Sequence, residues 1–359
     1  RRRRTRRTEK SRMTYWICIR KRVRQRSHRN RRSKPRPMAS TSGTVVYDGA
    51  SGNDTLDFSR QSDGVTVNLA ARALGIENVI GTRGDDIFTA GDDGVTVDGG
   101  AGDDHLTGGA GNDVLDGGAG DDVLIGTSNG DALIGDAGND LLLGEDGNDV
   151  AMGGAGSDTI DGGAGRDVLN GGDGDDLFIV RDANDGADIL FGGAGSDTLD
   201  LSAMTGGAVI DLGAYTAIGT VRAEGVTDHL IGVENVIGST GADMIKASLG
   251  INVMTGGDGK DIFVFVSAGT ADGDVITDFR PGDKIDLSGI DAMVGVNGIQ
   301  EFTLSNVATT DAGNLVIREV ATAEGVDTII DGFTDADDDV DFSITLRGAH
   351  TLSDTSFNF

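Results

Sequence analysis

One large apolar residue recurs every nine positions along the middle of the chain, and glycine and aspartate occupy most of the positions between. Nine consecutive units of the form GGxGxDxUx, in which U is apolar, run without a gap over residues 99–179. The six glycine-rich positions predict a turn, and the three positions around U predict a short strand. The apolar eighth positions are Leu106, Leu115, Leu124, Leu133, Leu142, Ala151, Ile160, Leu169 and Phe178.

Every unit of this array begins with a glycine and has an aspartate at its sixth position. Self-similarity at a short fixed period is typical of solenoid proteins, and an unbroken register over nine units is a strong signal. The glycines are Gly99, Gly108, Gly117, Gly126, Gly135, Gly144, Gly153, Gly162 and Gly171. The aspartates are Asp104, Asp113, Asp122, Asp131, Asp140, Asp149, Asp158, Asp167 and Asp176.

The pattern continues less regularly on both sides of the array. The unit at 81–89 keeps its aspartate as Asp86, whereas Val95 and Asn252 replace the aspartate in two other units. Alternating apolar and polar residues at 64–69 and 207–212 predict strands that extend the same solenoid. Isolated copies occupy 49–57, 192–200, 238–246 and 256–264, and the last three carry Asp197, Asp243 and Asp261.

Two units form a coil of 18 residues, so each turn stacks on the turn two units later. We therefore predict an all-β fold, a parallel β-roll or solenoid of two sheets, with eighth-position side chains inside and a β cap at the C-terminus. Each coil buries only about two aliphatic side chains, which offset little of the conformational entropy that ordering the coil costs. The fold needs a further source of stability.

The stacked turns supply that source in the form of bound cations. Stacking predicts one column of aspartates from Asp86 to Asp176 and a second from Asp113 to Asp167 on the opposite edge. Carboxylates and glycine-exposed backbone carbonyls form an all-oxygen, flexible ligand set, which suits Ca²⁺. Zn²⁺ would require His or Cys ligands, which are scarce here. We expect about eight calcium ions in the main array. The predicted ligands are Asp86, the nine array aspartates, the turns of Gly99, Gly108, Gly117, Gly135, Gly153, Gly162 and Gly171, and further along the chain Asp197, Asp243 and Asp261.

The units resemble the RTX (hemolysin-type) calcium-binding nonapeptide repeats. The segment GGDGKDIFVFVSAGTADGDVITDFRPGDKIDLSGID (256–291) resembles the C-terminal domain of serralysin-type proteases and RTX lipases, and both resemblances together cover residues 49–359. They imply a parallel β-roll with calcium bound by aspartates and turn carbonyls. They also imply type I secretion through an uncleaved C-terminal signal, with which the ending TLSDTSFNF (351–359) is compatible.

Charge and composition separate a basic leader from the rest of the chain. Residues 1–38 carry 18 Lys and Arg and one acid, Glu9, whereas the remainder holds 12 basic and 58 acidic residues, a net charge of −46. The leader is either a disordered arm for nucleic acid or anionic lipid, or, in the favoured interpretation, translated upstream sequence or an expression artefact. The acidic remainder argues against a nucleic-acid partner.

Cysteine content and apolar runs bound the cellular context. The single cysteine, Cys18, excludes an intramolecular disulfide framework. No run of 18 apolar residues is present, so we expect no membrane span, and no secretory signal peptide is recognisable. We expect an extracellular protein, secreted by the type I route. The predicted segments are the leader 1–38, degenerate repeats 39–98, the main β-roll 99–179, a second repeat block 180–264 and the serralysin-like cap 265–359.

One unit departs from the repeat. GTSNGDALI (126–134) lacks glycine at its second and fourth positions, which casts doubt on its turn and on the neighbouring sites. Its first five residues also match the G-x-S-x-G elbow of lipases, but the match falls inside a repeat turn with no hydrolase pattern around it, so catalysis at Ser128 is disfavoured.

No catalytic motif supports an enzyme. The protease zinc motif H-E-x-x-H is absent, and His105 is expected on the outside of a strand. The favoured function is calcium binding by an extracellular β-roll that folds on calcium after type I secretion, with calcium and the secretion machinery as partners. The alternatives are an adhesin or layer-forming protein that contacts cell-surface or matrix components, and a non-catalytic accessory part of a secreted protease or lipase.

Overall fold

The computed structural model describes residues 52–69, 75–181, 185–213, 219–223, 226–294, 300–305, 311–335, 337 and 339–359. The predicted leader, residues 1–38, lies outside the described residues. The described part is all-β, with two short 3-10 helices, η1 (Ala268–Thr270) and η2 (Asp354–Ser356). None of its helices is long and apolar enough to span a bilayer.

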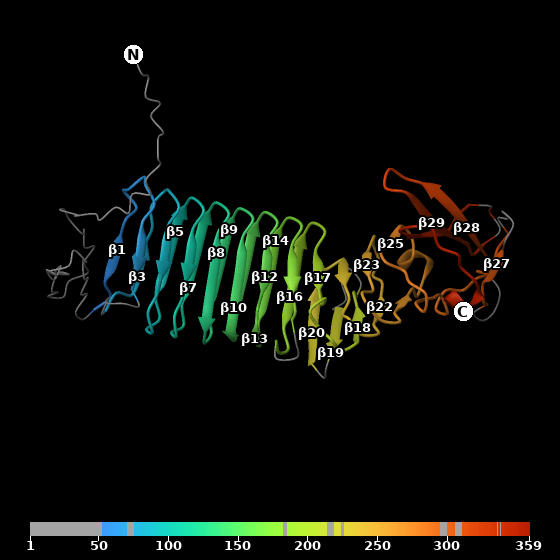
Figure 1. Cartoon of the computed structure of the whole chain (residues 1–359), viewed down its shortest axis with the longest axis horizontal. Helices are drawn as coiled ribbons and strands as arrows, with labels where there is room; N and C mark the ends of the chain where they lie inside the picture. Colours follow the sequence, from blue (N-terminus) through green and yellow to red (C-terminus); the bar gives the residue numbers. More distant parts are fainter. Residues whose placement is uncertain are drawn as a thin grey trace, which may run out of the picture.

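Two long sheets run along an elongated roll, and successive strands alternate between them (Figure 1). The first sheet contains, in spatial order, β1 (Thr55–Asp57), β3 (Asn78–Ile80), β5 (Thr96–Ala101), β7 (Val114–Ala119), β9 (Ala132–Ala137), β11 (Val150–Ala155), β14 (Val168–Asp173), β16 (Ile189–Ala194), β20 (Val226–Ile231), β19 (Gly219–Ala223), β18 (Ala208–Asp211), β22 (Met244–Lys246), β24 (Ile262–Val264), β26 (Lys284–Asp286) and β31 (Phe357–Asn358).

The second sheet faces the first across the core and holds the alternate strands. It contains, in spatial order, β2 (Thr66–Asn68), β4 (Ile87–Thr89), β6 (His105–Thr107), β8 (Val123–Ser128), β10 (Leu141–Gly147), β12 (Thr159–Asp161), β15 (Leu177–Ile179), β17 (Thr198–Asp200), β21 (Asn235–Ile237), β23 (Val253–Thr255), β25 (Asp274–Ile276), β30 (Phe342–Leu346), β29 (Val326–Phe333), β28 (Asn314–Ala321) and β27 (Thr303–Ser305); β13 (Ala164–Gly165) pairs with β10.

The predicted coil of 18 residues is confirmed by the strand register. β8 pairs in parallel with β10 so that Leu124 lies beside Leu142, and β9 pairs with β11 so that Leu133 lies beside Ala151. All nine eighth-position side chains of the array are almost fully buried. Because side chains of a strand alternate between faces, this register leaves the seventh and ninth positions outside. The core is therefore a stack of single aliphatic or aromatic side chains from each sheet.

The strands predicted at 64–69 and 207–212 are present as β2 and β18. An antiparallel insertion, β18–β19–β20, interrupts the otherwise parallel first sheet, after which the parallel coils resume. Toward the C-terminal end, β30, β29 and β28 form an antiparallel meander in the second sheet, and β27 pairs in parallel with β28 as its last strand; Figure 1 labels β27, β28 and β29. The last strand, β31, pairs with β26.

Candidate metal sites

The repeat turns hold each sixth-position aspartate in a fixed orientation. The backbone N–H of Asp104 donates to Oδ1 of Asp122 at 2.7 Å, and the N–H of Asp122 donates to Oδ1 of Asp140 at 2.8 Å. Each aspartate thus donates to the carboxylate one coil further on. Since both groups are buried, this hydrogen bond fixes one carboxylate oxygen and directs the other into the turn.

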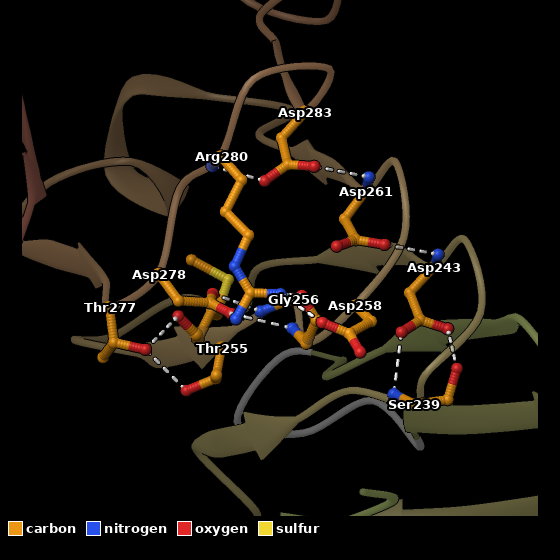
Figure 2. A network of polar contacts seen from close by, with 12 residues as sticks. Ser239, Asp243, Thr255, Gly256, Asp258, Asp261, Thr277, Asp278, Arg280 and Asp283 are labelled. Carbon is orange, nitrogen blue, oxygen red and sulfur yellow. Dashed lines mark hydrogen bonds and ion pairs between the residues drawn. The ribbon is translucent and has the colours of Figure 1, made fainter. Parts of the chain in front are cut away.

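The predicted aspartates form two columns, one along each edge of the roll. N–H to carboxylate bonds of this kind join Asp86, Asp104, Asp122, Asp140, Asp158, Asp176 and Asp197 in the first column. They join Asp113, Asp131, Asp149, Asp167, Asp188 and Asp228 in the second. After the antiparallel insertion, Asp243, Asp261 and Asp283 are joined in the same way (Figure 2).

Most of these carboxylates keep one buried oxygen without a hydrogen-bond partner. Asp131 is 3% exposed, its Oδ1 accepts the N–H of Asp113, and its Oδ2 accepts nothing. An unpaired buried carboxylate oxygen is costly, because burial removes its water and nothing replaces it. The aspartates with such an oxygen are Asp104, Asp122, Asp131, Asp140, Asp149, Asp158, Asp167, Asp176, Asp197, Asp261 and Asp274.

The first glycine of a unit leaves an oxygen-lined gap beside this free oxygen. A Cβ placed on Gly126 would lie 2.6 Å from Asp131 Oδ2 and 2.8 Å from the carbonyl oxygen of Gly144, one coil further on. Any side chain would therefore fill the space between carboxylate and carbonyl. The predicted site glycines also lie against the aspartate of their own unit: Gly99, Gly108, Gly117, Gly135, Gly153, Gly162 and Gly171.

Burial and mutual repulsion raise the pKa of the stacked carboxyls. Burial first, and neighbouring column carboxylates second, raise the pKa of Asp122, Asp131 and Asp140 to about 7, although the N–H donors lower it. The pKa of Asp188 is raised to about 8 for the same reasons. Without a cation, the columns therefore resist carrying full negative charge at neutral pH.

This donor set fits a hard cation that accepts oxygen ligands, as Ca²⁺ does. Among the residues that the structure describes, no three His, Cys, Asp or Glu side chains converge on one point. The repeat turns offer a different ligand set. The gap at Gly126 is lined by one free carboxylate oxygen and one backbone carbonyl oxygen, and not by several carboxylates. A calcium ion bound there would supply positive charge between stacked turns.

Sequence reasoning missed four aspartates that extend the columns. Asp188 follows Asp167 by 21 residues rather than 18, because its unit is longer, and Asp228 lies beyond the insertion. Asp274 accepts the N–H of Asn252, and Asp283 accepts that of Asp261. Each of the four aspartates is followed two residues later by a leucine or an isoleucine, namely Leu190, Leu230, Ile276 and Ile285. The D-x-[LI] end of the repeat could therefore have located them.

The comparisons with known proteins agree with this arrangement. Residues 96–124, 125–160 and 143–178 match the model of the RTX calcium-binding nonapeptide repeat. Residues 187–357 match the model of the Peptidase M10 serralysin C terminal. The fold and these matches define a calcium-binding β-roll. The chain carries RTX repeats followed by a serralysin-type C-terminal region.

The solved structures include a partial match. The solution structure of the AlgE6R3 subunit from the Azotobacter vinelandii mannuronan C5-epimerase is 18% identical, with a TM-score of 0.27, over 55% of this chain and 81% of that chain. The search of the curated proteins found no match.

Proposed function

We propose that this chain is an extracellular calcium-binding β-roll that folds when its stacked turns bind calcium after export by the type I route. The observation that carries this proposal is the series of buried, unpartnered carboxylate oxygens. Eight of the nine array aspartates have one, and Asp197, Asp261 and Asp274 continue the series. One ion for each such oxygen gives eight ions in the main array.

Charge accounts for the difference between the two states. Without calcium, the folded roll confines ionised carboxylates in columns at one-coil spacing, which opposes folding at neutral pH. Calcium binds to the folded turns and so stabilises them by RT ln(1 + [L]/Kd) for each site. Extracellular calcium modules bind at roughly 10⁻⁴–10⁻³ M, far above cytosolic calcium. The chain would therefore be unfolded before export and folded after it.

The position of the C-terminal segment supports export before folding. Phe357 is buried and lies in β31, which pairs with β26, and its ring stacks on that of Phe359 at 5.4 Å. Within a secretion signal at residues 351–359, the fold buries Phe357, while Thr351, Ser353, Asp354 and Thr355 stay exposed. The buried Phe357 side chain would be available to the secretion machinery only while the chain is unfolded, as the proposed calcium switch requires.

Far-UV circular dichroism of the full-length chain, titrated with calcium from a chelated start, tests the proposal. We expect a cooperative transition from coil to β structure near millimolar calcium, and no such transition with magnesium. Magnesium is the control because it binds proteins in a smaller octahedral geometry and keeps its waters. A chain with full β content in chelator would refute calcium-dependent folding.

A specific surface feature favours contact with a cell surface or matrix as a second candidate function. The outer face of the first sheet exposes apolar side chains on neighbouring strands, and a monomer rarely exposes a contiguous patch of this kind. Its members are Val150, Met152, Val168, Phe191 and Ile231. Light scattering after size exclusion should show larger assemblies in calcium, which Met152→Asp should dissolve. A strictly monomeric protein at all calcium concentrations would contradict assembly.

A further inference from the structure

The repeat turns fall into two classes, which differ at the second position of the unit. In an open turn, the second residue has a positive φ, as at Gly118 and Gly154, and the aspartate of that unit keeps its unpartnered Oδ2. In a closed turn, the second residue does not have a positive φ, and the N–H of this second residue donates to Oδ2 of the unit's aspartate. A change in the sign of φ turns over the preceding peptide, so that its N–H points toward the carboxylate or away from it.

Three of the predicted column aspartates lie in closed turns; Asp283 is also bonded at both oxygens, because its Oδ2 accepts the N–H of Arg280 at 2.6 Å. The N–H of Thr82 donates to Asp86 Oδ2 at 2.6 Å, that of Gly109 to Asp113 Oδ2 at 2.7 Å, and that of Ser239 to Asp243 Oδ2 at 2.7 Å. Figure 2 shows the third of these, in which the Ser239 hydroxyl also donates to Asp243 Oδ1. Both oxygens of each carboxylate therefore accept hydrogen bonds.

The closed turn at Asp113 is notable because its second residue is a glycine that could adopt either sign of φ. The cause lies one coil further on, in the unit that departs from the repeat. The hydroxyl of Thr127 donates to the carbonyl of Gly109, and the side-chain amide of Asn129 donates to the carbonyl of Ala110. These two residues stand where most other units of the array have glycine at the second position and all of them have glycine at the fourth.

Thr127 and Asn129 thus donate hydrogen bonds to the backbone carbonyl oxygens that would otherwise face a cation. In the same turn, the N–H of Gly109 donates to the Asp113 carboxylate. A cation in this gap would meet the positive ends of N–H and O–H groups and would have to displace three hydrogen bonds. The neighbouring gap differs, since Asp131 Oδ2 in the same column has no partner.

We propose that the closed turns of Asp86, Asp113 and Asp243 are held by hydrogen bonds in place of calcium, and that Thr127 and Asn129 remove the calcium site between the turns 108–113 and 126–131. This inference rests on the proposed function, in which the open turns bind calcium. The gaps between stacked turns are then of two kinds, metal-bound and metal-free, and the residues at the second and fourth positions of a unit determine which kind forms.

The number of calcium ions bound at saturation, measured on the full-length chain by native mass spectrometry, tests this inference. Asp131→Asn should lose one ion relative to wild type, whereas Asp113→Asn, one coil away in the same column, should lose none. The double substitution Thr127→Gly and Asn129→Gly restores the regular repeat and should gain one ion. Glu145→Gly is the matched control: Glu145 also has a positive φ at a second position, but Asp149 already has a free oxygen, so the count should not change.

The outcomes separate the inference from the function on which it rests. A wild-type chain that binds no calcium would overturn both. A wild-type chain that binds calcium, but loses one ion with Asp113→Asn as it does with Asp131→Asn, would overturn the closed turns alone. A double glycine variant that folds and gains no ion would also overturn the proposal, and this variant remains informative if the aspartate variants fail to fold.

Discussion

At the scale of single residues, the roll depends on one oxygen per turn. Oδ1 of Asp140 accepts the N–H of Asp122, and its Oδ2 has no hydrogen-bond partner. One oxygen therefore stabilises the stacked turns, and the other is available to a cation. The first glycine of the unit, Gly135, keeps the space beside Oδ2 clear. Aspartate and glycine therefore act as a pair, and the chain needs both at every open turn.

A methyl group at this glycine should weaken calcium binding. Gly135→Ala would place its Cβ against Asp140 Oδ2 and the Gly153 carbonyl oxygen. Loss of one well-formed site costs about 1–3 kcal/mol. Because about eight ions bind in the same cooperative transition, the calcium midpoint of folding should rise by about 1.2- to 2-fold. Ala137→Gly in the same turn is the control, because Ala137 is exposed and its methyl is not needed. Circular dichroism measures the calcium midpoint of folding for each variant. The same midpoint for Gly135→Ala and for wild type would contradict the role of the gap in calcium binding.

The raised carboxyl pKa values predict how pH acts on the calcium-free chain. Burial, with repulsion from neighbouring carboxylates, raises the pKa of Asp122 and Asp167 from the ordinary 3.8 to about 7 in the folded roll. Their protonation stabilises the fold fully below about pH 4, and that stability is lost as pH rises toward 7. In chelator, acidification from pH 8 to pH 5 should therefore increase β content. A signal independent of pH over this range would refute the prediction.

At the scale of elements, each strand contributes little on its own. Most strands of the array bury one large side chain. Leu142 in β10, for example, lies between Leu124 and Ile160, which occupy the same position one coil before and one coil after it. The aliphatic ladder therefore sets the register, while the turns contribute the charge that calcium neutralises. The antiparallel insertion β18–β20 shows that the sheet tolerates a change of strand direction between coils.

Removal of one ladder side chain should destabilise the calcium-bound roll. Leu142→Ala leaves a cavity between Leu124 and Ile160, which lie beside it in β8 and β12. The expected loss is about 2–5 kcal/mol in the free energy of unfolding. Val150→Ala, at a position 41% exposed on β11, should change it by less than about 0.5 kcal/mol. Denaturant unfolding at saturating calcium measures both, and similar losses for the two variants would be inconsistent with a single-ladder core.

At the scale of the whole molecule, much of the fold follows from the nine-residue period. The period predicts coils, two parallel sheets, inward ladders and two aspartate columns, because each is a local consequence of repetition. It does not predict the closed turn at Asp113, since Gly109 belongs to a regular unit and its conformation depends on Thr127, which is 18 residues away. It also misses Asp188, because a longer unit shifts the count while the stacking remains.

Hydrogen exchange of the full-length chain, followed by mass spectrometry in chelator and in millimolar calcium, tests the central claim most directly. The central claim is that calcium in the stacked turns makes the roll fold. We predict amide protection across the repeats 81–276 in calcium and rapid exchange of the same peptides in chelator. Protection of the array that is equally strong in chelator would contradict the claim, because the columns would then be stable without their cations.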